Sequence, residues 1–285
     1  MRYKLSAPAT LHTTIQLPAS KSISNRALIL HALAQGHIAP SNLSDCDDTR
    51  VMIKALDGNP GHIDILAAGT AMRFLTAYLS VTPGTRIITG TERMQQRPIR
   101  ILVDALRELG AQIEYAGKEG FPPLRITGTE LTGEEISLAG NVSSQYISAL
   151  LMIGPILKNG LRLNLTGEII SRPYINLTLQ LMKEFGADAA WSSESSITVR
   201  PGKYRDIPFT VESDWSGASY WYQMVALIQD NEKKESTKTE IKLPGLLPRS
   251  YQGDSRGAEI FAKLGVHTTY TDQGVVLTKM GTPVT

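Results

Sequence analysis

Cysteine is almost absent from this 285-residue chain, and that absence limits the classes to which the protein can belong. With Cys46 alone, no internal disulfide can form, which excludes a small secreted scaffold held by disulfides. The five histidines show no spacing typical of zinc ligands, so we expect no metal site. The sequence also lacks a G-x-S-x-G elbow, a Walker loop and a G-x-G-x-x-G motif, which removes the common hydrolase and nucleotide-binding classes.

An excess of charge and a long apolar run are also missing. The 29 Lys and Arg residues nearly balance the 27 Asp and Glu residues, and a net charge of +2 gives no basic footprint for nucleic acid. The longest charge-free stretch, residues 136–157, contains the apolar segment YISALLMIGPIL, which is shorter than the roughly 20 residues that span a bilayer. Residues 1–20 contain no apolar core typical of a signal peptide. We therefore expect a cytoplasmic protein without a nucleic-acid or membrane partner.

The sequence does contain an internal repeat. Two segments, beginning at Arg97 and Arg172, open with Arg-Pro and continue with apolar residues at helical spacing. They end at Gly-Ala pairs, at Gly110 and Gly186. Proline suits the first turn of a helix and glycine suits its C-terminal cap, so both segments are predicted to be helices.

A second pair of helix starts has the same separation. The segments AAGTAMRFLTAYL and NVSSQYISALLMI each place small residues before an apolar helix. Gly69 and Ser144 are 75 residues apart, as are Arg97 and Arg172, and two matching offsets indicate a duplication. Similar segments elsewhere predict four units, near residues 14–66, 67–138, 139–204 and 211–280.

Strands are predicted between these helices. RIITGTE, PLRITGTEL and LRLNLTGEI are typical of strands that end in glycine turns. Alternation of strands and helices indicates the α/β class. The charge-rich segment 229–242 is expected to be a solvated loop.

The start of the first helix could bind an anion. A helix N-terminus offers free N–H groups and the positive end of the helix dipole. Lys21 adds a mobile positive charge, and Arg26, one turn later, can bind a planar carboxylate through two hydrogen bonds. The alternative is that Ser20 caps the helix and that both cations are simply solvated.

Other helix starts share this character. The segment VSSQ, residues 142–145, offers two hydroxyls and an amide that suit either a phosphate or a cap. Gly69 would let a ligand approach the backbone closely. Arg97 and Arg172 each precede a helix-opening proline, where a cation is unfavourable unless an anion compensates it.

Six segments carry a resemblance to a known family. In chain order they are LPASKSISNRALIL, DCDDTRVM, AAGTAMRFLTAYL, TGTERMQQRPI, GNVSSQYISALLM and ISRPYINLTLQLM. Together they closely resemble the 5-enolpyruvylshikimate-3-phosphate (EPSP) synthases, or 3-phosphoshikimate 1-carboxyvinyltransferases, over essentially the whole chain. The related UDP-N-acetylglucosamine enolpyruvyl transferases share the fold but differ at the S-K-S-x-S-N-R segment.

The resemblance implies an architecture. It predicts an α/β enolpyruvyl transferase fold of repeated βαβαββ units, with three units in each of two domains and the active site in the cleft between them. Residues 14–210 are expected to form one complete three-unit domain, and residues 1–13 and 211–285 part of a second. The short stretch 56–63 indicates that the first unit has lost a hairpin.

The resemblance also implies a reaction. It predicts transfer of the enolpyruvyl (carboxyvinyl) group of phosphoenolpyruvate to the 5-hydroxyl of shikimate-3-phosphate, with release of phosphate, in the shikimate pathway to chorismate and the aromatic amino acids. The implied shikimate-3-phosphate ligands are Lys21, Ser22, Arg26, Ser143, Ser144, Gln145, Ser171 and Tyr174. The implied phosphoenolpyruvate ligands are Lys21, Gly69, Arg97 and Gln145. No metal or organic cofactor is implied, and a monomer is expected.

Two alternatives remain beside this enzyme. The family's acid and base residues belong to units that would follow Thr285, so no catalytic residue is assigned, and an inactive phosphoshikimate-binding fragment is one alternative. A UDP-N-acetylglucosamine enolpyruvyl transferase is the other. The chain also departs from the family at Ala67, usually Asn, and at Phe74, usually Pro. In the incomplete fourth unit, we expect the aromatic side chains to be partly exposed or covered by another chain: Trp215, Tyr220, Trp221 and Tyr222.

Overall fold

The computed structural model describes residues 11–58, 60–228 and 239–280, which fall into two compact units. The continuous unit comprises Lys21–Val211, and the discontinuous unit comprises Met1–Ser20 with Glu212–Thr285. Residues 14–20, which the sequence analysis grouped with the following helices, cluster with the discontinuous unit. The backbone explains this grouping, because Ile15 N–H donates to the carbonyl of Lys242 and Ser20 N–H to that of Glu212.

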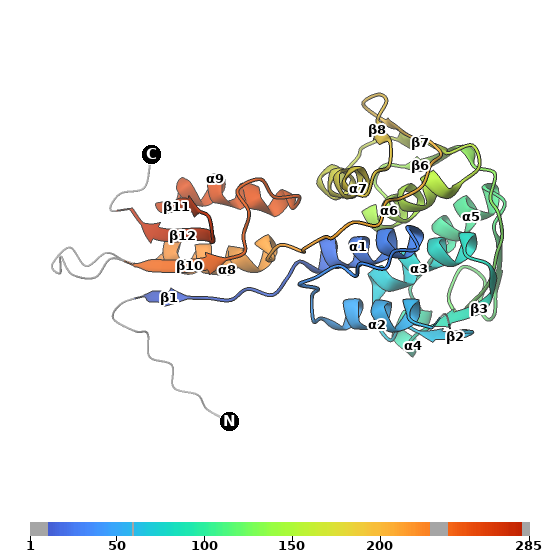
Figure 1. Cartoon of the computed structure of the whole chain (residues 1–285), viewed down its shortest axis with the longest axis horizontal. Helices are drawn as coiled ribbons and strands as arrows, with labels where there is room; N and C mark the ends of the chain where they lie inside the picture. The colour runs from blue at the N-terminus through green and yellow to red at the C-terminus, as the bar shows by residue number, and fades with distance from the viewer. Residues whose placement is uncertain (1–10, 59, 229–238, 281–285) are drawn as a thin grey trace. The chain divides into compact units, whose positions relative to one another are not determined.

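The elements alternate along the chain as an α/β protein requires (Figure 1). In the continuous unit they are α1 (Lys21–Leu33), α2 (Asp47–Leu56), β2 (His62–Asp64), α3 (Gly69–Val81), β3 (Gly84–Thr89), α4 (Glu92–Gln95), α5 (Arg100–Glu108), β4 (Gln112–Tyr115), β5 (Leu124–Gly128), β6 (Glu134–Ala139), α6 (Ser144–Ile153), η1 (Gly154–Ile156), β7 (Leu161–Thr166), α7 (Arg172–Glu184), β8 (Ala189–Trp191) and β9 (Ser196–Val199). In the discontinuous unit they are β1 (His12–Thr14), α8 (Trp215–Leu227), β10 (Glu240–Pro244), η2 (Gly253–Arg256), α9 (Gly257–Ala262), β11 (Val266–Thr271) and β12 (Gly274–Lys279).

Three four-stranded sheets share one strand order, which confirms the duplication. The orders are β2-β3-β5-β4, β6-β7-β9-β8 and β1-β10-β12-β11. In each sheet the first pair is parallel and the other pairs are antiparallel. The repeats therefore open with β2 and β6, whereas the predicted unit boundaries, near residues 66/67 and 138/139, place nearly all of both strands in the preceding unit. Those boundaries were wrong because HID has only three residues and EEISLA opens with two charged residues, so neither segment gave a clear strand signal.

Both helix ends predicted from glycine are confirmed, but only one of the two helix starts predicted from proline is. Gly110 and Gly186 follow the ends of α5 and α7 with positive φ values of 100° and 90°, as expected of C-terminal caps. Pro173 lies in the first turn of α7, as predicted. Pro98 does not lie in a helical turn, because α5 begins only at Arg100 and its N-cap is Ile99.

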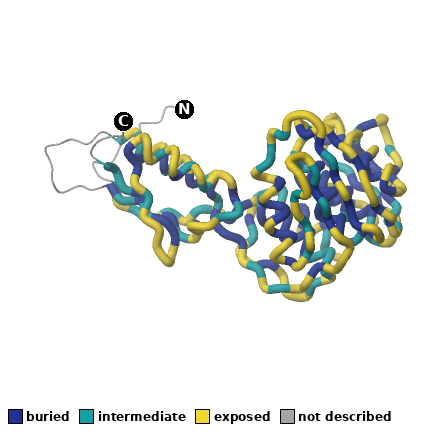
Figure 2. Tube along the Cα trace, turned by 90° about the horizontal axis from the view of Figure 1, so that it is seen from above, coloured by how far each residue is buried: buried dark blue, intermediate teal, exposed yellow. Residues whose placement is uncertain are grey.

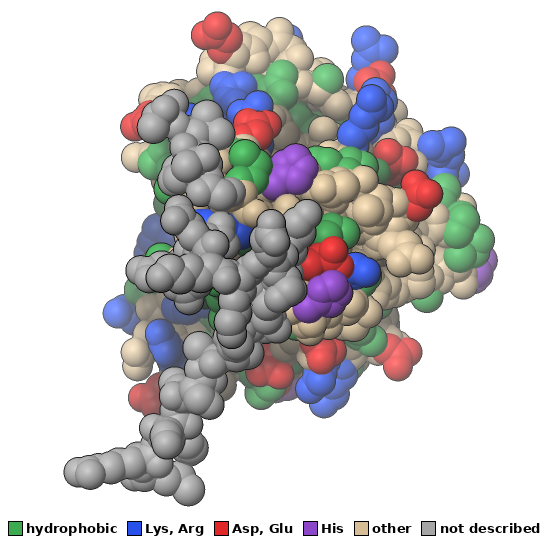
Figure 3. Space-filling view, turned by 90° about the vertical axis from the view of Figure 1, so that its left-hand side faces the viewer, with side chains coloured by type: hydrophobic (Ala, Val, Ile, Leu, Met, Phe, Trp, Pro, Cys, Tyr) green, Lys and Arg blue, Asp and Glu red, His purple; other side chains and the backbone are tan. Residues whose placement is uncertain are grey.

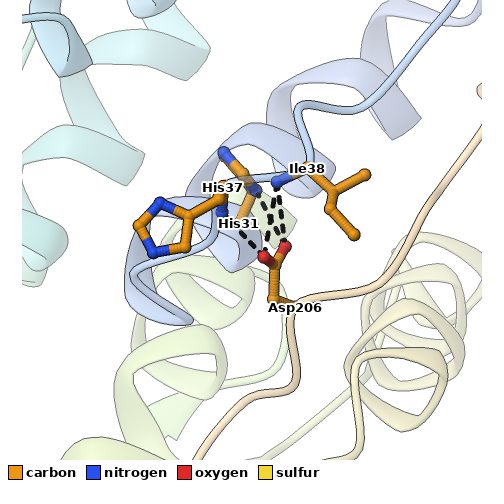
Figure 4. A network of polar contacts seen from close by, with 4 residues as sticks. All are labelled: His31, His37, Ile38 and Asp206. Carbon is orange, nitrogen blue, oxygen red and sulfur yellow. Dashed lines mark hydrogen bonds and ion pairs between the residues drawn. The ribbon is translucent and has the colours of Figure 1, made fainter.

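Among its described residues, the first predicted unit has no four-stranded sheet like those of the other units. No strand is described between α2 and β2, which agrees with the expected loss of a hairpin. A backbone pairing remains, since Ser41 N–H donates to the Phe209 carbonyl at 2.8 Å. Beside it, the Asp206 carboxylate accepts the N–H groups of His37 at 2.7 Å and Ile38 at 3.3 Å (Figure 4). The His37 N–H in particular lowers the pKa of Asp206.

The core of the continuous unit is a group of helices buried on every side. Every residue is buried in three runs: 23–30 of α1, 69–77 of α3 and 146–153 of α6. In contrast, α2, α5 and α7 bury one face and expose the other. Helices that are buried on every side form the interior of the unit, and the amphipathic helices cover them. Figure 2 shows the buried segments in dark blue in the interior of this unit.

The discontinuous unit buries α8 against its own sheet. Trp215 and Tyr222 are only 2% and 1% exposed, and they pack with Ile241, Leu243 and Leu277 of the strands. The expectation that both would be partly exposed was therefore wrong. Tyr220 points away from this cluster and is 68% exposed. Trp221 is half-buried, as expected.

The charge-rich segment 229–242 can be judged only in part. Residues 229–238 lie outside the described residues, while Glu240–Lys242 begin β10 and are not a loop. On the face seen in Figure 3, basic and acidic side chains are interspersed, as the balanced composition suggests. No helix within the described ranges has the length and apolar character needed to cross a membrane.

We predict that two neighbouring aromatic residues of α8 differ sharply in their effect on stability. Tyr222→Ala should destabilise the discontinuous unit by about 3–5 kcal/mol, because the ring is buried and its hydroxyl lies 3.0 Å from Thr268 Oγ1. Tyr220→Ala should change stability by less than about 0.5 kcal/mol, because the ring is exposed. Urea denaturation followed by tryptophan fluorescence measures both. Equal losses would contradict the burial of Tyr222.

Candidate anion-binding site

The expected ligand residues cluster around helix starts that carry no negative charge. Of the α-helices in the continuous unit, α1, α3, α5, α6 and α7 have no Asp or Glu in the first turn. By comparison, α2 and α4 begin with acidic residues. An acidic side chain at a helix N-terminus would neutralise the positive end of the dipole. Arg100 at the start of α5 already pairs with Glu119, at 3.3 Å. The starts of α1, α3, α6 and α7, near the expected ligand residues, are therefore suited to bind anions from outside the chain.

Gly69 and Arg97 lie in direct contact. A Cβ atom added to Gly69 would lie 2.5 Å from Arg97 Nη1 and 2.8 Å from Nη2, so the guanidinium group rests on the glycine backbone. Gly69 is the first residue of α3. A cation and a helix N-terminus repel each other, and only an anion between or beside them makes the pair favourable. This contact is the strongest geometric sign of an anion site.

Arg73, which was not predicted from the sequence, binds the backbone on both sides of this contact. Its side chain is only 4% exposed. Nη1 donates to the Gly69 carbonyl at 3.2 Å and Nη2 to the Pro98 carbonyl at 3.2 Å. The Tyr146 hydroxyl donates to the same Pro98 carbonyl at 2.8 Å, and its ring lies 5.8 Å from the guanidinium. Burial lowers the pKa of Arg73. These bonds hold Pro98, and with it the backbone of Arg97, in place.

Gln145 connects two helix starts. Its side-chain amide donates to Thr70 Oγ1 at 3.1 Å, which joins the first turn of α6 to the first turn of α3. Gln145 therefore lies close to Gly69, the neighbour of Thr70. Ser143 is the N-cap of α6, and its hydroxyl accepts the Gln145 N–H at 3.3 Å. Ser144 is the first residue of the helix.

Arg26 is buried rather than solvated. It is 3% exposed, and its guanidinium donates to Thr178 Oγ1 at 2.7 Å, Ser148 Oγ at 3.0 Å and the Ser22 carbonyl at 2.9 Å. Burial lowers its pKa to about 10, an effect that Tyr174 partly offsets. The simpler alternative, a solvated cation behind a serine cap, is therefore wrong for Arg26. The Ser20 hydroxyl does not cap the helix either, because it has no partner among the described residues.

The remaining candidates fall into two groups. Lys21 is exposed and is the first residue of α1, and Ser171 is the N-cap of α7. Both residues therefore lie at helix starts. Arg172, which shares its sequence pattern with Arg97, is not part of the cluster. Its guanidinium stacks 4.2 Å from the Trp191 ring and donates to the Glu194 carbonyl.

The cluster carries positive charge without an internal counter-charge. None of the ion pairs among the described residues involves Lys21, Arg26, Arg73 or Arg97. Burying a cation without a partner is costly, and here carbonyls, hydroxyls and aromatic rings replace the carboxylate. The arrangement can bind anionic groups of a ligand. Arg73 could have been found from the repeat, because it follows Gly69 by four residues as Arg26 follows Ser22.

Comparisons with known proteins agree with the resemblance. The family model described as EPSP synthase (3-phosphoshikimate 1-carboxyvinyltransferase) matches residues 5–58 and 59–284. The chain is 71% identical over 284 residues to 3-phosphoshikimate 1-carboxyvinyltransferase of Bacteroides fragilis (strain ATCC 25285), an alignment covering 100% of this chain and 67% of that protein. It is 38% identical over 291 residues to the Shewanella halifaxensis protein of the same name, covering 92% and 66%.

Solved structures show the same fold. EPSP synthase from Acinetobacter baumannii matches with a TM-score of 0.78 at 20% identity, over 96% of this chain and 65% of that chain. The enolpyruvyl transferase NikO from Streptomyces tendae matches with a TM-score of 0.66 at 14% identity, over 95% and 66%. The expected α/β enolpyruvyl transferase fold is confirmed. The chain spans about two-thirds of the length of these relatives.

We predict that alanine is tolerated at Gly69 but not at Gly128. In Gly69→Ala the atoms nearest to the new Cβ belong to the flexible end of Arg97, which can move, so Tm should change by less than about 4 °C. In Gly128→Ala the Cβ would lie 1.7 Å from the Thr82 carbonyl oxygen, so Tm should fall by more than about 5 °C. Calorimetry measures both values. A large loss in Gly69→Ala would mean that Arg97 is fixed rather than displaceable.

Proposed function

Because the chain belongs to the EPSP synthase (3-phosphoshikimate 1-carboxyvinyltransferase) family, we propose that it binds shikimate-3-phosphate and phosphoenolpyruvate for enolpyruvyl transfer. In this reaction the 5-hydroxyl of shikimate-3-phosphate gives up its proton and attacks the central carbon of phosphoenolpyruvate, while the methylene carbon takes up a proton and becomes a methyl group. The resulting tetrahedral intermediate then loses phosphate from the central carbon and a proton from the methyl group, which restores the carbon–carbon double bond. The product carries the carboxyvinyl group, as the shikimate pathway to aromatic amino acids requires.

The contact between Gly69 and Arg97 is the observation that carries this proposal. It supplies backbone N–H groups and a guanidinium at one point, with Arg73 adding positive charge behind it. We assign phosphoenolpyruvate to this subsite, with Lys21 and Gln145 completing it. Phosphate and carboxylate groups suit such a site, because hydrogen bonds to ionised groups are stronger than neutral ones.

The second subsite is assigned to shikimate-3-phosphate. Its proposed ligands are Lys21, Ser22, Arg26, Ser143, Ser144, Gln145, Ser171 and Tyr174, which lie on the first two turns of α1, α6 and α7 or at their caps. Hydroxyls and N–H groups at such positions can hold a phosphate, and Arg26 and Lys21 supply its counter-charge. Two subsites on helices that share one core would hold the two substrates side by side, which is the positioning that the transfer needs.

The described residues of the cluster bind and orient rather than transfer protons. Its side chains are those of Lys, Arg, Ser, Thr, Gln and Tyr, and no carboxylate or imidazole is among the partners described above. Proton transfer at neutral pH needs a group that titrates near that pH within hydrogen-bond reach. An inactive phosphoshikimate-binding fragment is a second candidate, because none of the described partners in the cluster is a carboxylate or an imidazole.

Other assignments follow from the family. The UDP-N-acetylglucosamine transferase alternative is not favoured, because the family model and the named relatives specify 3-phosphoshikimate as acceptor. We propose a monomer located in the cytoplasm, which sedimentation velocity and cell fractionation would test.

We predict that Lys21→Ala weakens shikimate-3-phosphate binding by roughly tenfold to a hundredfold, the range for a hydrogen bond to a charged group. Isothermal titration calorimetry on the chain measures the affinity, and raising the salt concentration should weaken wild-type binding because exposed charges are screened. Lys54→Ala, an exposed lysine in the last turn of α2, is the matched control and should bind normally. If both variants bind like the wild type, Lys21 is not a ligand.

We predict that the 285-residue chain alone releases phosphate from the two substrates at least about 100-fold more slowly than its full-length relatives, because acid–base groups contribute that much or more. A phosphate-release assay measures the rate before and after addition of the remaining third of the Bacteroides fragilis relative as a separate polypeptide. Recovery of turnover after addition supports a binding half that lacks proton-transfer groups. Turnover at the relatives' rate without it refutes the prediction.

A further inference from the structure

We propose that Thr178 and Ser148 are positioning residues that hold the Arg26 guanidinium in the orientation required by the phosphoshikimate ligand. Neither belongs to the expected ligand set. The proposal rests on the proposed function, in which Arg26 is a shikimate-3-phosphate ligand. The hydrogen bonds from which it is argued, however, lie within the fold and can be tested without a ligand.

The two hydroxyls meet Arg26 from two different helices. Arg26 is on α1, Ser148 is on α6 and Thr178 is on α7. Thr178 Oγ1 accepts from Arg26 Nε at 2.7 Å, and Ser148 Oγ accepts from Nη2 at 3.0 Å. The two hydroxyl oxygens lie 2.8 Å apart, so they form a hydrogen bond with each other. Arg26 is therefore held along one edge by a closed pair of hydroxyls.

One arrangement of hydrogens satisfies every atom of this group. Thr178 Oγ1 lies 2.9 Å from the Tyr174 carbonyl, to which its hydrogen can be donated. Ser148 then donates to Thr178 Oγ1, whose two lone pairs receive Ser148 and Arg26 Nε. Each hydroxyl has a defined direction in this arrangement. A network in which all members are satisfied fixes the orientation of its side chains.

Arg26 needs this support because it has no carboxylate partner among the described residues. Its other contacts are the Ser22 carbonyl, at 2.9 Å from Nη1, and the Phe74 ring, whose centroid lies 5.2 Å from Cζ. A guanidinium carries five N–H hydrogens, and these contacts use three of them in hydrogen bonds. One hydrogen on each Nη therefore remains for an anionic ligand. Rotation of the side chain would misdirect that pair of donors.

Removing the Thr178 hydroxyl should release Arg26 without creating a cavity. In Thr178→Val the shape is kept, but Arg26 Nε loses its acceptor and Ser148 loses the acceptor for its hydrogen. Both groups are buried, so each will turn toward another partner. Thr178→Ser keeps the hydroxyl and should keep the network.

Thr76→Val is the matched control. Thr76 is fully buried in α3, and its hydroxyl donates to the backbone carbonyl four residues earlier, Met72, as that of Thr178 donates to Tyr174. It has no described contact with an arginine. The control therefore reproduces the loss of a buried threonine hydroxyl in a helix, without the loss of a guanidinium partner.

The first experiment is a calorimetric titration of the chain with shikimate-3-phosphate. Thr178→Val should weaken binding by roughly tenfold or more, Ser148→Ala should also weaken it, and Thr178→Ser should restore it to within about threefold of the wild type. Thr76→Val should bind normally even if its Tm falls as far as that of Thr178→Val. Equal weakening in Thr76→Val and Thr178→Val, or failure of Thr178→Ser to restore binding, would overturn the proposal.

The second experiment needs no ligand and separates this inference from the proposed function. In nitrogen-15 NMR spectra, the Arg26 Nε–H proton should exchange slowly with water in the wild type, in Thr178→Ser and in Thr76→Val, and much faster in Thr178→Val. If the wild type fails to bind shikimate-3-phosphate, the proposed function fails, and unchanged exchange in Thr178→Val would still decide against the positioning role. Fast exchange in that variant alone supports it.

Discussion

Burial of positive charge without negative partners is the constraint on which the continuous unit depends. Arg26 and Arg73 lie inside its helical core, 3% and 4% exposed, and the ion pairs among the described residues include neither. A buried cation raises the free energy of the folded state unless polar groups replace its water. Here backbone carbonyls, hydroxyls and aromatic faces do so, and this leaves the charge available to a ligand. A carboxylate would stabilise the protein better and block the site.

The duplication gives both arginines the same surroundings. Each donates from Nη1 to the carbonyl four residues earlier, Ser22 for Arg26 and Gly69 for Arg73. Each also faces an aromatic ring from the next internal helix, Phe74 for Arg26 and Tyr146 for Arg73. At the corresponding position of α6 stands Ser148, which contacts Arg26 on α1. The contacts thus run from α1 to α3, from α3 to α6 and from α6 back to α1.

Local sequence patterns predicted much of this arrangement. The features that they did not predict depend on contacts between residues far apart in the sequence. Matching offsets revealed the repeats, and Gly110 and Gly186 marked two helix ends because a positive φ is a local property. Pro98 led to a wrong prediction of where α5 begins. Its carbonyl accepts hydrogen bonds from Arg73 and from Tyr146, and such partners cannot be inferred from neighbouring residues. The burial of Arg26 escaped notice for the same reason. Its acceptor Thr178 lies 152 residues away.

The lost hairpin of the first repeat shows which part of this architecture can change freely. Without a four-stranded sheet of its own, α1 still lies against α3 and α6, because Arg26, Phe74 and Ser148 fix it from within. The internal helices therefore hold their positions without the strands and loops, and insertions or deletions among the strands and loops should leave the spacing of the two proposed subsites unchanged. In evolutionary terms, length variation among such proteins should concentrate in the sheets and loops, and the buried runs of the internal helices α1, α3 and α6 should keep their length.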